Sequence, residues 1–252
     1  MNNKPDFTNT IEEWSNFFIP LSDGVQLAAR AWLPTNAIEQ PVPAILEYIP
    51  YRKRDGTAIR DEQMHPYWAA FGYACVRVDI RGSGESDGLL LDEYLQQELD
   101  DAVEVINWLE HQDWCSGKVG MMGKSWGGFN CLQVAALRPS ALKAIITVCS
   151  TDDRYADDCH YRGGAVLIEN FSWASTISGF MAKPPDPLLL PETWRENWLE
   201  RLQNMPFFAK NWLEHTYKDA YWKHGSINED YSAIEAAVYC VGGWGDAYSV
   251  AI

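Results

Sequence analysis

The sequence has no apolar run long enough to cross a bilayer and no closely spaced pair of cysteines. Its longest apolar stretches, such as ALKAIITVC at 141–149, fall far short of the roughly 20 residues that a membrane-spanning helix needs. The N-terminal MNNKPDFTNTIEEW lacks a basic segment followed by an apolar one, so no secretory signal is predicted. Six scattered cysteines without a C-x-x-C pair argue against a zinc site or a redox dithiol. They are expected to be buried, reduced thiols in a cytoplasmic protein.

Positive charge is also scarce. The chain has 20 Lys and Arg against 35 Asp and Glu, which gives a formal net charge of -15. This balance argues against a nucleic-acid or anionic-membrane partner. The 252 residues are 47% hydrophobic and 22% charged, as expected for one large folded domain or a domain with an inserted cap. No metal or cofactor motif is present, so neither is expected, and a homo-oligomer is left open.

Strand-like and helix-like segments alternate over the first 150 residues. Two strands around an Asp-Gly turn are predicted within 15–33. Further strands are predicted at 42–50, 73–80, 118–122 and 143–149, and helices at 61–72, 92–111 and 127–139. This alternation predicts an α/β fold with a mostly parallel sheet and helices on both faces.

The pattern changes after residue 150. Residues 151–235 are rich in tryptophan, tyrosine and charge, and helices are predicted at 192–205 and 206–224. A sheet strand resumes at 236–243. We therefore expect three segments: an N-terminal core at 1–150, a helical cap insertion at 151–235, and a return to the core at 236–252 that stops before the last strands.

The stretch VGMMGKSWGGFN, residues 119–130, contains two competing motifs. Gly-Lys-Ser is how a phosphate-binding loop ends, but that loop needs its first glycine at position 118, which is a lysine. Gly-x-Ser-x-Gly lies between a predicted strand and a predicted helix, which is the context of a hydrolase nucleophile elbow. Gly123 and Gly127 keep the backbone around Ser125 clear, and the helix amides point at a forming oxyanion. The second interpretation is favoured.

Four stretches occur in a fixed order: VPAILEYIPYRKRDG, VDIRGSGESDG, GKVGMMGKSWGGF and VGGWGDAYS. Together they resemble the cocaine esterase and X-prolyl dipeptidyl-peptidase family of serine hydrolases, the CocE/NonD type, over about residues 15–252. The resemblance implies an α/β-hydrolase fold with a helical cap. It implies that Ser125 is the nucleophile and Asp246 the triad acid. The Trp126 amide and the Tyr51 hydroxyl match the two oxyanion donors of the family.

The turn DIRGSGESDG at 79–88 also matches the family, and we expect it to be mainly structural. Its glycines suit a tight loop, and Asp79 and Arg81 are expected to form a buried or half-buried ion pair.

A catalytic base is missing from the pattern. In this fold the triad order is Ser, Asp, His, but all five histidines precede Asp246. The resemblance places the histidine some tens of residues after the acid, followed by a β-rich domain. The sequence therefore predicts the front part of a longer enzyme that hydrolyses substrates poorly by itself. His160 is expected to be a cap residue rather than a substitute base. The alternative is a non-catalytic binding module on a hydrolase scaffold, although such a module has no need for Ser125, Tyr51 and Asp246.

The expected substrate is a small ester or a peptide-like molecule. Tryptophans of the cap are candidates for the wall of an apolar acyl or aryl pocket, with helix packing as the simpler alternative: Trp173, Trp194, Trp198, Trp212 and Trp222. Trp173 is the one we assign to the site. In TDDRYADDCH, Asp152 and Asp157 are candidates for holding a substrate amine. Helix capping and a solvated face are the simpler explanation for these aspartates.

Overall fold

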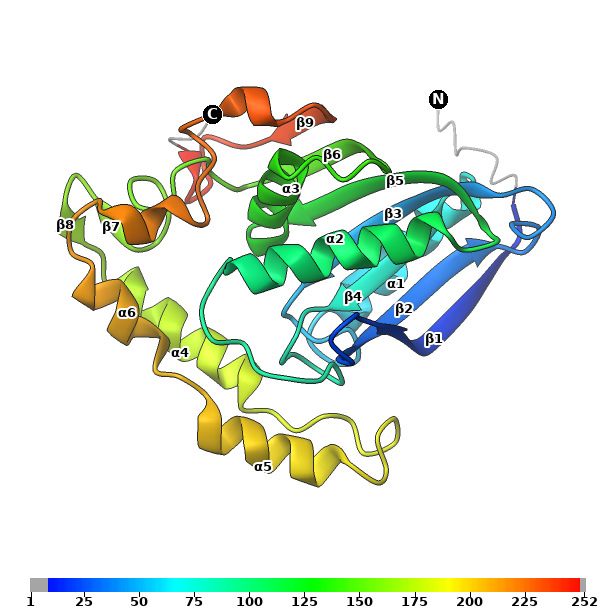
Figure 1. Ribbon diagram of the computed structural model, residues 1–252, viewed down its shortest axis with the longest axis horizontal. Helices are drawn as coiled ribbons and strands as arrows, with labels where there is room; N and C mark the ends of the chain where they lie inside the picture. Colours follow the sequence, from blue (N-terminus) through cyan, green and yellow to red (C-terminus); the bar gives the residue numbers. More distant parts are fainter. Residues whose placement is uncertain (1–8, 250–252) are drawn as a thin grey trace.

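The computed structural model describes residues 9–249. A seven-stranded sheet with the order β1-β2-β4-β3-β5-β6-β9 forms its centre (Figure 1). The strands are β1 (Ile11–Pro20), β2 (Gln26–Pro34), β3 (Val42–Ile49), β4 (Ala74–Asp79), β5 (Cys115–Lys124), β6 (Leu142–Val148) and β9 (Ala237–Val241). The β1–β2 and β2–β4 pairs are antiparallel, and the other four pairs are parallel. The predicted α/β class with a mostly parallel sheet is confirmed.

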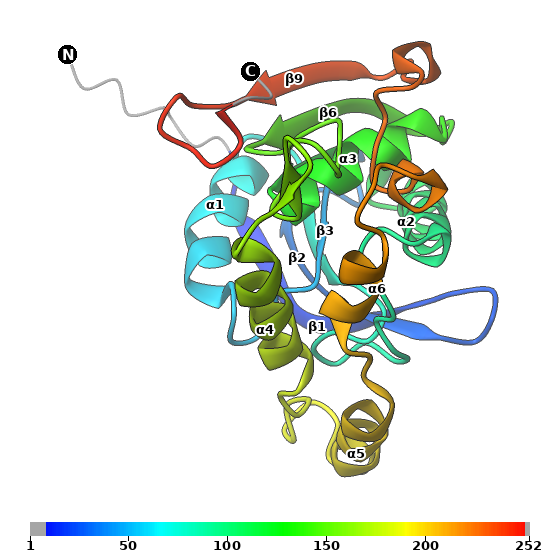
Figure 2. The ribbon, with the colours of Figure 1, turned by 90° about the vertical axis from the view of Figure 1, so that its left-hand side faces the viewer.

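Helices cover both faces of the sheet. Helix α1 (Ala58–Ala70) lies on one face, and α2 (Gln96–Glu110) and α3 (Trp126–Ala136) lie on the other (Figures 1 and 2). In α2 the predicted apolar stripe is buried, including Leu99 and Ile106. Helix α3 is buried along nearly its whole length because it lies between the sheet and its neighbours α2 and η2.

Between β6 and β9 the chain leaves the sheet and forms mostly helical structure. Its elements are β7 (Tyr161–Arg162), β8 (Ala165–Val166), α4 (Glu169–Met181), α5 (Trp194–Asn204), α6 (Phe208–Glu214), η1 (Ala220–Lys223) and η2 (Tyr231–Ala233). Helix α4 and the β7–β8 hairpin were not predicted. The continuous helix predicted at 206–224 is wrong. The helix is interrupted after α6 by two hydrogen bonds. The Asp219 side chain accepts from the Tyr221 amide at the start of η1, and the Trp222 indole donates to the His215 carbonyl.

The loop after β4 supports the cap. Arg201 of α5 donates to the carbonyl of Gly84 (2.7 Å) and to that of Ser86. Both acceptors belong to the turn at 79–88. Helix α5 lies far from the sheet in Figure 1, so this contact ties the outer part of the cap to the core.

The expected ion pair between Asp79 and Arg81 is wrong. Asp79 instead accepts from Arg77 at 3.1 Å, because the two side chains are two residues apart on β4 and therefore share one face of the strand. Arg81 lies beyond the end of the strand and pairs with Asp101 of α2 at 2.7 Å.

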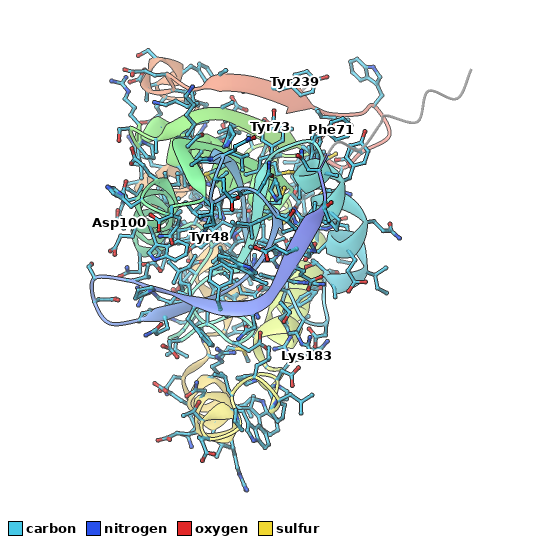
Figure 3. The ribbon with its side chains drawn as sticks, turned by 90° about the vertical axis from the view of Figure 1, so that its right-hand side faces the viewer. Tyr48, Phe71, Tyr73, Asp100, Lys183 and Tyr239 are labelled. Carbon is cyan, nitrogen blue, oxygen red and sulfur yellow. The ribbon has the colours of Figure 1, made fainter. Side chains whose placement is uncertain are left out.

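Strand β9 forms one edge of the sheet and is exposed over all five of its residues. Tyr239, at 67% exposure, projects from its outer side (Figure 3). Cys240 is exposed on the same strand, and Cys149 and Cys159 are half-buried, so the expectation that all six cysteines are buried is confirmed only for Cys75, Cys115 and Cys131. No helix within residues 9–249 is both long and apolar enough to pass through a bilayer.

Candidate active site

Ser125 lies on a strained turn between β5 and α3. Its φ is 54° and its ψ is -117°, a conformation that non-glycine residues rarely adopt. The turn is closed tightly by glycines. A Cβ at position 123 would lie 2.4 Å from the carbonyl carbon of Gly127, so a side chain there cannot be accommodated. This is the geometry of a nucleophile elbow, which raises the serine hydroxyl above the end of the sheet.

Two candidate oxyanion donors converge on this turn. Trp126 is the first residue of α3, where backbone amides have no partner within the helix. Tyr51 follows β3, and its hydroxyl lies close to the Ser125 side chain. Burial, together with the negative charge of Glu93, raises the pKa of the Tyr51 hydroxyl well above its usual range. The hydroxyl therefore keeps its proton and is able to donate a hydrogen bond to an oxyanion.

A buried carboxylate anchors the start of α3. Glu98 of α2 accepts from the Trp126 indole at 2.6 Å and from the Tyr94 amide at 2.9 Å. Burial raises the pKa of Glu98 to about 7, even though these donors favour the ionised form. The sequence analysis missed this residue. Glu98 could have been recognised in the sequence because it is a charged residue one turn before Ala102, on the side of the helix that faces the core.

Asp246 lies beyond β9, at the same edge of the sheet as Ser125. The strands β5, β6 and β9 are consecutive neighbours and run parallel, so their carboxyl ends meet there. Asp246 accepts from the Tyr248 amide at 3.0 Å. This hydrogen bond first, and then the nearby Cys149 thiol, lower the pKa of Asp246. The carboxylate is thus ionised and oriented, as a triad acid must be.

Tyr248 is a site residue that the sequence analysis missed. Its hydroxyl lies 3.3 Å from the Ser125 Oγ and donates to the Asp158 Oδ1 at 3.2 Å. Burial and the charge of Asp158 raise the pKa of the Tyr248 hydroxyl. The hydroxyl is therefore a donor rather than a base. Its position two residues after Asp246 was the available signal.

Of the five cap tryptophans, Trp173 of α4 is the one whose ring contacts the oxyanion residues. Its ring centroid lies 6.4 Å from that of Tyr51 and 6.2 Å from that of Trp126. The others pack within the cap. Trp212 and Trp222 are fully buried, and Trp194 and Trp198 stack on each other in α5.

Asp152 and Asp157 do not converge on one point. Asp152 accepts from the Tyr231 hydroxyl and lines a cavity of ≈ 500 Å³ beside β9. Asp157 lines a different cavity of ≈ 310 Å³. Burial, and the nearby carboxylates of Asp153 and Asp152, raise the pKa of Asp157. Tyr248 borders both cavities, and its hydroxyl lies 3.3 Å from the Ser125 Oγ.

The side chains of the five histidines contact partners other than Ser125. Their partners are Glu47 for His65, the Asn107 carbonyl for His111, Glu93 for His160, Asp219 for His215 and Arg154 for His224. Among the described residues, no imidazole is therefore hydrogen-bonded to the Ser125 hydroxyl.

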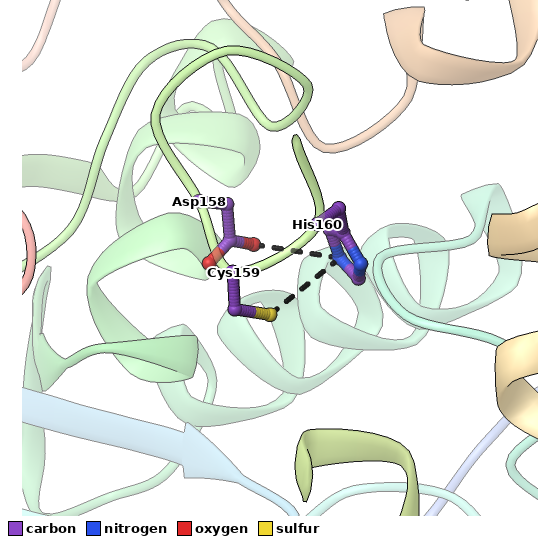
Figure 4. Close-up of side chains that lie close together, drawn as sticks. All are labelled: Asp158, Cys159 and His160. Carbon is purple, nitrogen blue, oxygen red and sulfur yellow. Dashed lines mark hydrogen bonds and ion pairs between the residues drawn. The ribbon is translucent and has the colours of Figure 1, made fainter. Parts of the chain in front are cut away.

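Two clusters within residues 9–249 have the spacing of metal ligands. One is Glu47, Asp61 and His65, and the other is Asp158, Cys159 and His160 (Figure 4). In the first cluster the carboxylates already face guanidinium groups, those of Arg60 and Arg77. In the second, the His160 Nε2 is engaged by Glu93 at 3.0 Å. Neither donor set is therefore suited to a cation.

A strained serine between strand and helix on a mostly parallel sheet defines the class: the protein has an α/β-hydrolase fold. Residues 23–251 match the model of the X-Pro dipeptidyl-peptidase (S15) family, and the chain belongs to that family. The chain is 28% identical to cocaine esterase from Rhodococcus sp. (strain MB1 Bresler) over 258 residues, a match that covers 93% of this chain and 44% of that protein.

Solved structures of similar fold extend well beyond this chain. A CocE/NonD family hydrolase from Staphylococcus aureus superposes with a TM-score of 0.69 at 21% identity, covering 90% of this chain and 40% of that one. An α-amino acid ester hydrolase gives a TM-score of 0.68 at 21% identity, covering 99% and 48%. The chain thus spans less than half the length of these relatives.

Proposed function

We propose that the chain is the nucleophile-bearing part of a serine hydrolase that cleaves an ester or an amide through an acyl-enzyme on Ser125. The observation that carries this proposal is the strained Ser125 turn with the protonated Tyr51 hydroxyl beside it. In the proposed reaction the Ser125 Oγ attacks the carbonyl carbon. The Tyr51 hydroxyl and the Trp126 amide stabilise the oxygen that becomes negative, and each such donor contributes about 3 kcal/mol. Asp246 orients the base and stabilises its charge.

The step that the described residues do not supply is removal of the serine proton. Each histidine is engaged elsewhere, and the Tyr248 hydroxyl beside Ser125 holds its own proton. We therefore infer that the chain by itself hydrolyses substrates poorly, since an unassisted serine is a weak nucleophile at neutral pH.

Labelling with a fluorophosphonate tests the proposal directly. Mass spectrometry should find the label on Ser125, and added imidazole should accelerate the reaction by supplying a base. The control is Ser125→Ala under the same conditions. Labelling that is as fast in Ser125→Ala, or that reaches other serines equally, would contradict the proposal. Rapid hydrolysis of 4-nitrophenyl acetate by the chain without imidazole would instead contradict the missing base.

A non-catalytic binding module on the same scaffold is the second candidate. The engagement of all five histidines by other partners favours it. In that case ligands would bind without any dependence on the Ser125 hydroxyl, and imidazole would have no effect on labelling.

The substrate is proposed to be a small ester or a peptide-like molecule. Trp173 would form the apolar wall beside the oxyanion donors. Asp157 would hold a substrate amine through the ≈ 310 Å³ cavity. Binding of glycylproline 4-nitroanilide and of its des-amino analogue compares the two possibilities. A preference for the amine that is reduced in Asp157→Asn supports the peptide-like substrate, and equal binding supports the ester.

A further inference from the structure

Two consecutive carboxylates reach from the hydrolase core into the cap. Asp92 and Glu93 precede α2 and are 4% and 1% exposed. Asp92 accepts from the Trp212 indole at 3.0 Å and from the Tyr221 hydroxyl at 2.6 Å. The donors to Glu93 also lie in the cap, but one of them is Trp173, the tryptophan beside the candidate oxyanion donors.

The two oxygens of Glu93 have separate tasks. Oε1 accepts from the Trp173 indole. Oε2 accepts from Arg154 at 2.7 Å and faces the His160 Nε2 at 3.0 Å. All of these partners are held within the protein, and Arg154 and His160 are fully buried. One oxygen of the carboxylate is thus fixed by Arg154 and His160, and the other holds the Trp173 indole.

The two ring nitrogens of His160 each have a defined hydrogen-bonding partner. The Asn170 amide nitrogen donates to the His160 carbonyl at 3.1 Å, so the Asn170 Oδ1 must be the atom that faces the His160 Nδ1 at 3.1 Å. The Nε2 faces the Glu93 carboxylate, with the Asp158 Oδ2 at 3.7 Å (Figure 4). Both ring nitrogens of His160 therefore face side-chain oxygens.

The ionised state of Glu93 follows from the same neighbours. Burial opposes the charge, but Arg154 and His160 outweigh it and lower the pKa of Glu93 to about 2. A charged acceptor forms a stronger hydrogen bond to an indole N–H than a neutral one. The Trp173 ring is thereby held in one orientation, against Tyr51 on one side and Trp126 on the other.

We propose that Glu93 is a positioning residue, which fixes the Trp173 ring as the wall of the acyl pocket and so determines how well acyl groups large enough to touch that ring are bound. The inference rests on the proposed function for the location of the pocket. It makes Glu93 act through Trp173 alone, without contact to the substrate. Asp92 is the matched comparison, because it is a neighbouring buried carboxylate that faces Arg154 too, at 3.6 Å, but accepts from Trp212 and Tyr221 instead of Trp173.

The test is a double-mutant cycle of Glu93→Gln and Trp173→Phe, read by the binding of two uncleaved carboxamides. Phenylacetamide reaches the Trp173 ring, and acetamide does not. We expect Glu93→Gln to weaken phenylacetamide binding about tenfold and acetamide binding less than twofold. In the Trp173→Phe protein, Glu93→Gln should have no further effect. Asp92→Asn should lower stability without changing the ratio of the two affinities. Equal losses for both ligands, or additive effects of the two substitutions, would overturn the proposal.

A second measurement does not depend on the pocket. With 5-fluorotryptophan incorporated, the ¹⁹F resonance of Trp173, assigned by its loss in Trp173→Phe, should shift or broaden in Glu93→Gln and stay unchanged in Asp92→Asn. An unchanged resonance in Glu93→Gln would overturn the positioning role. If the resonance responds but neither carboxamide binds, the proposed pocket is wrong while the positioning role stands. If Glu93→Gln does not fold, Trp173→Phe, which removes the indole donor and keeps a ring, should still weaken phenylacetamide selectively, and an equal loss for both ligands would overturn the proposal.

Discussion

The candidate nucleophile and the candidate acid lie at the same edge of the sheet, at the ends of β5 and β9 with β6 between them, but they are held very differently. Ser125 precedes a helix that is buried from Trp126 to Ala135, and its turn is closed by glycines in contact. Asp246 follows a strand whose five residues are all exposed. The Ser125 turn is therefore fixed by the core of this chain, whereas Asp246 is held by a local hydrogen bond from the Tyr248 amide. The backbone around the serine is thus firmly supported, and the segment around Asp246 is weakly supported.

Gly123→Ala should have the largest effect. Its Cβ would meet the Gly127 backbone at 2.4 Å, so the turn and the start of α3 must move apart. We expect a loss of about 3 kcal/mol or more in the free energy of unfolding, measured by urea denaturation. The control is Gly245→Ala beside the acid, where a Cβ would meet nothing within 4 Å, and where a change within about 0.5 kcal/mol is expected. Similar losses of stability at the two glycines would show that the segments around Ser125 and Asp246 are held equally tightly.

Glu98→Gln should change how stability depends on pH. The pKa of Glu98 is about 7 in the folded protein, against the ordinary value of 4.5 for a glutamate exposed to water. Between these values the folded state retains a proton that the unfolded state releases. The stabilisation is therefore complete below pH 4.5 and is lost as the pH rises to about 7, by about 3 kcal/mol in total.

The Glu98→Gln protein should lack this dependence, as seen in urea midpoints from pH 4 to 8. Asp100→Asn, on the exposed face of the same helix, serves as the control and should follow the wild type (Figure 3). Parallel curves for the wild type and Glu98→Gln would show that Glu98 does not set the stability of the elbow.

Tyr248→Phe tests the contact between the segment around Asp246 and the Ser125 turn. It removes the hydroxyl that joins Ser125 to Asp158 and leaves the ring packed against Phe129. We expect a loss of about 1 kcal/mol in unfolding free energy, because a buried acceptor on Asp158 loses its donor. Tyr239→Phe on the exposed strand β9 is the matched control and should be neutral. A neutral Tyr248→Phe would mean that the acid-side segment is not coupled to the nucleophile.

Asp246→Asn should have the smallest effect on stability. Its carboxylate is partly exposed and its hydrogen bonds are local, so the thermal midpoint should match that of the wild type within error. Differential scanning calorimetry of the two proteins decides this. A destabilisation as large as that of Tyr248→Phe would show that the acid is built into the fold after all.

The sequence analysis predicted the parts of the molecule that depend on local pattern. Strand and helix positions in the first 150 residues follow from alternation and apolar periodicity, and the strand-to-helix position of Ser125 follows from its glycines. The cap was predicted less well, because its helix ends are determined by side chains from distant segments. The break after α6, for example, depends on a hydrogen bond from Trp222 to His215.

Buried charges show the limit of prediction from sequence most clearly. Asp79 and Arg81 were expected to pair, but Asp79 faces Arg77 on β4, and Arg81, which lies beyond the end of that strand, pairs with Asp101 of α2. Glu93 and Glu98 carry no motif, and their roles depend on which indole the tertiary structure brings to them. Whether Asp246 and Tyr51 act as a triad acid and an oxyanion donor stays a prediction that rests on motif and geometry.

The loop between β4 and α2 gives the cap two attachments to the core. Its first part receives Arg201 through two backbone carbonyls, and its last part presents Asp92 and Glu93 to the tryptophans of the cap. A cap exchanged with that of a relative would lose both attachments unless residues 82–95 were exchanged with it. The loop and the cap are therefore one unit for recombination and engineering, although some 60 residues of sequence separate Glu93 from Arg154.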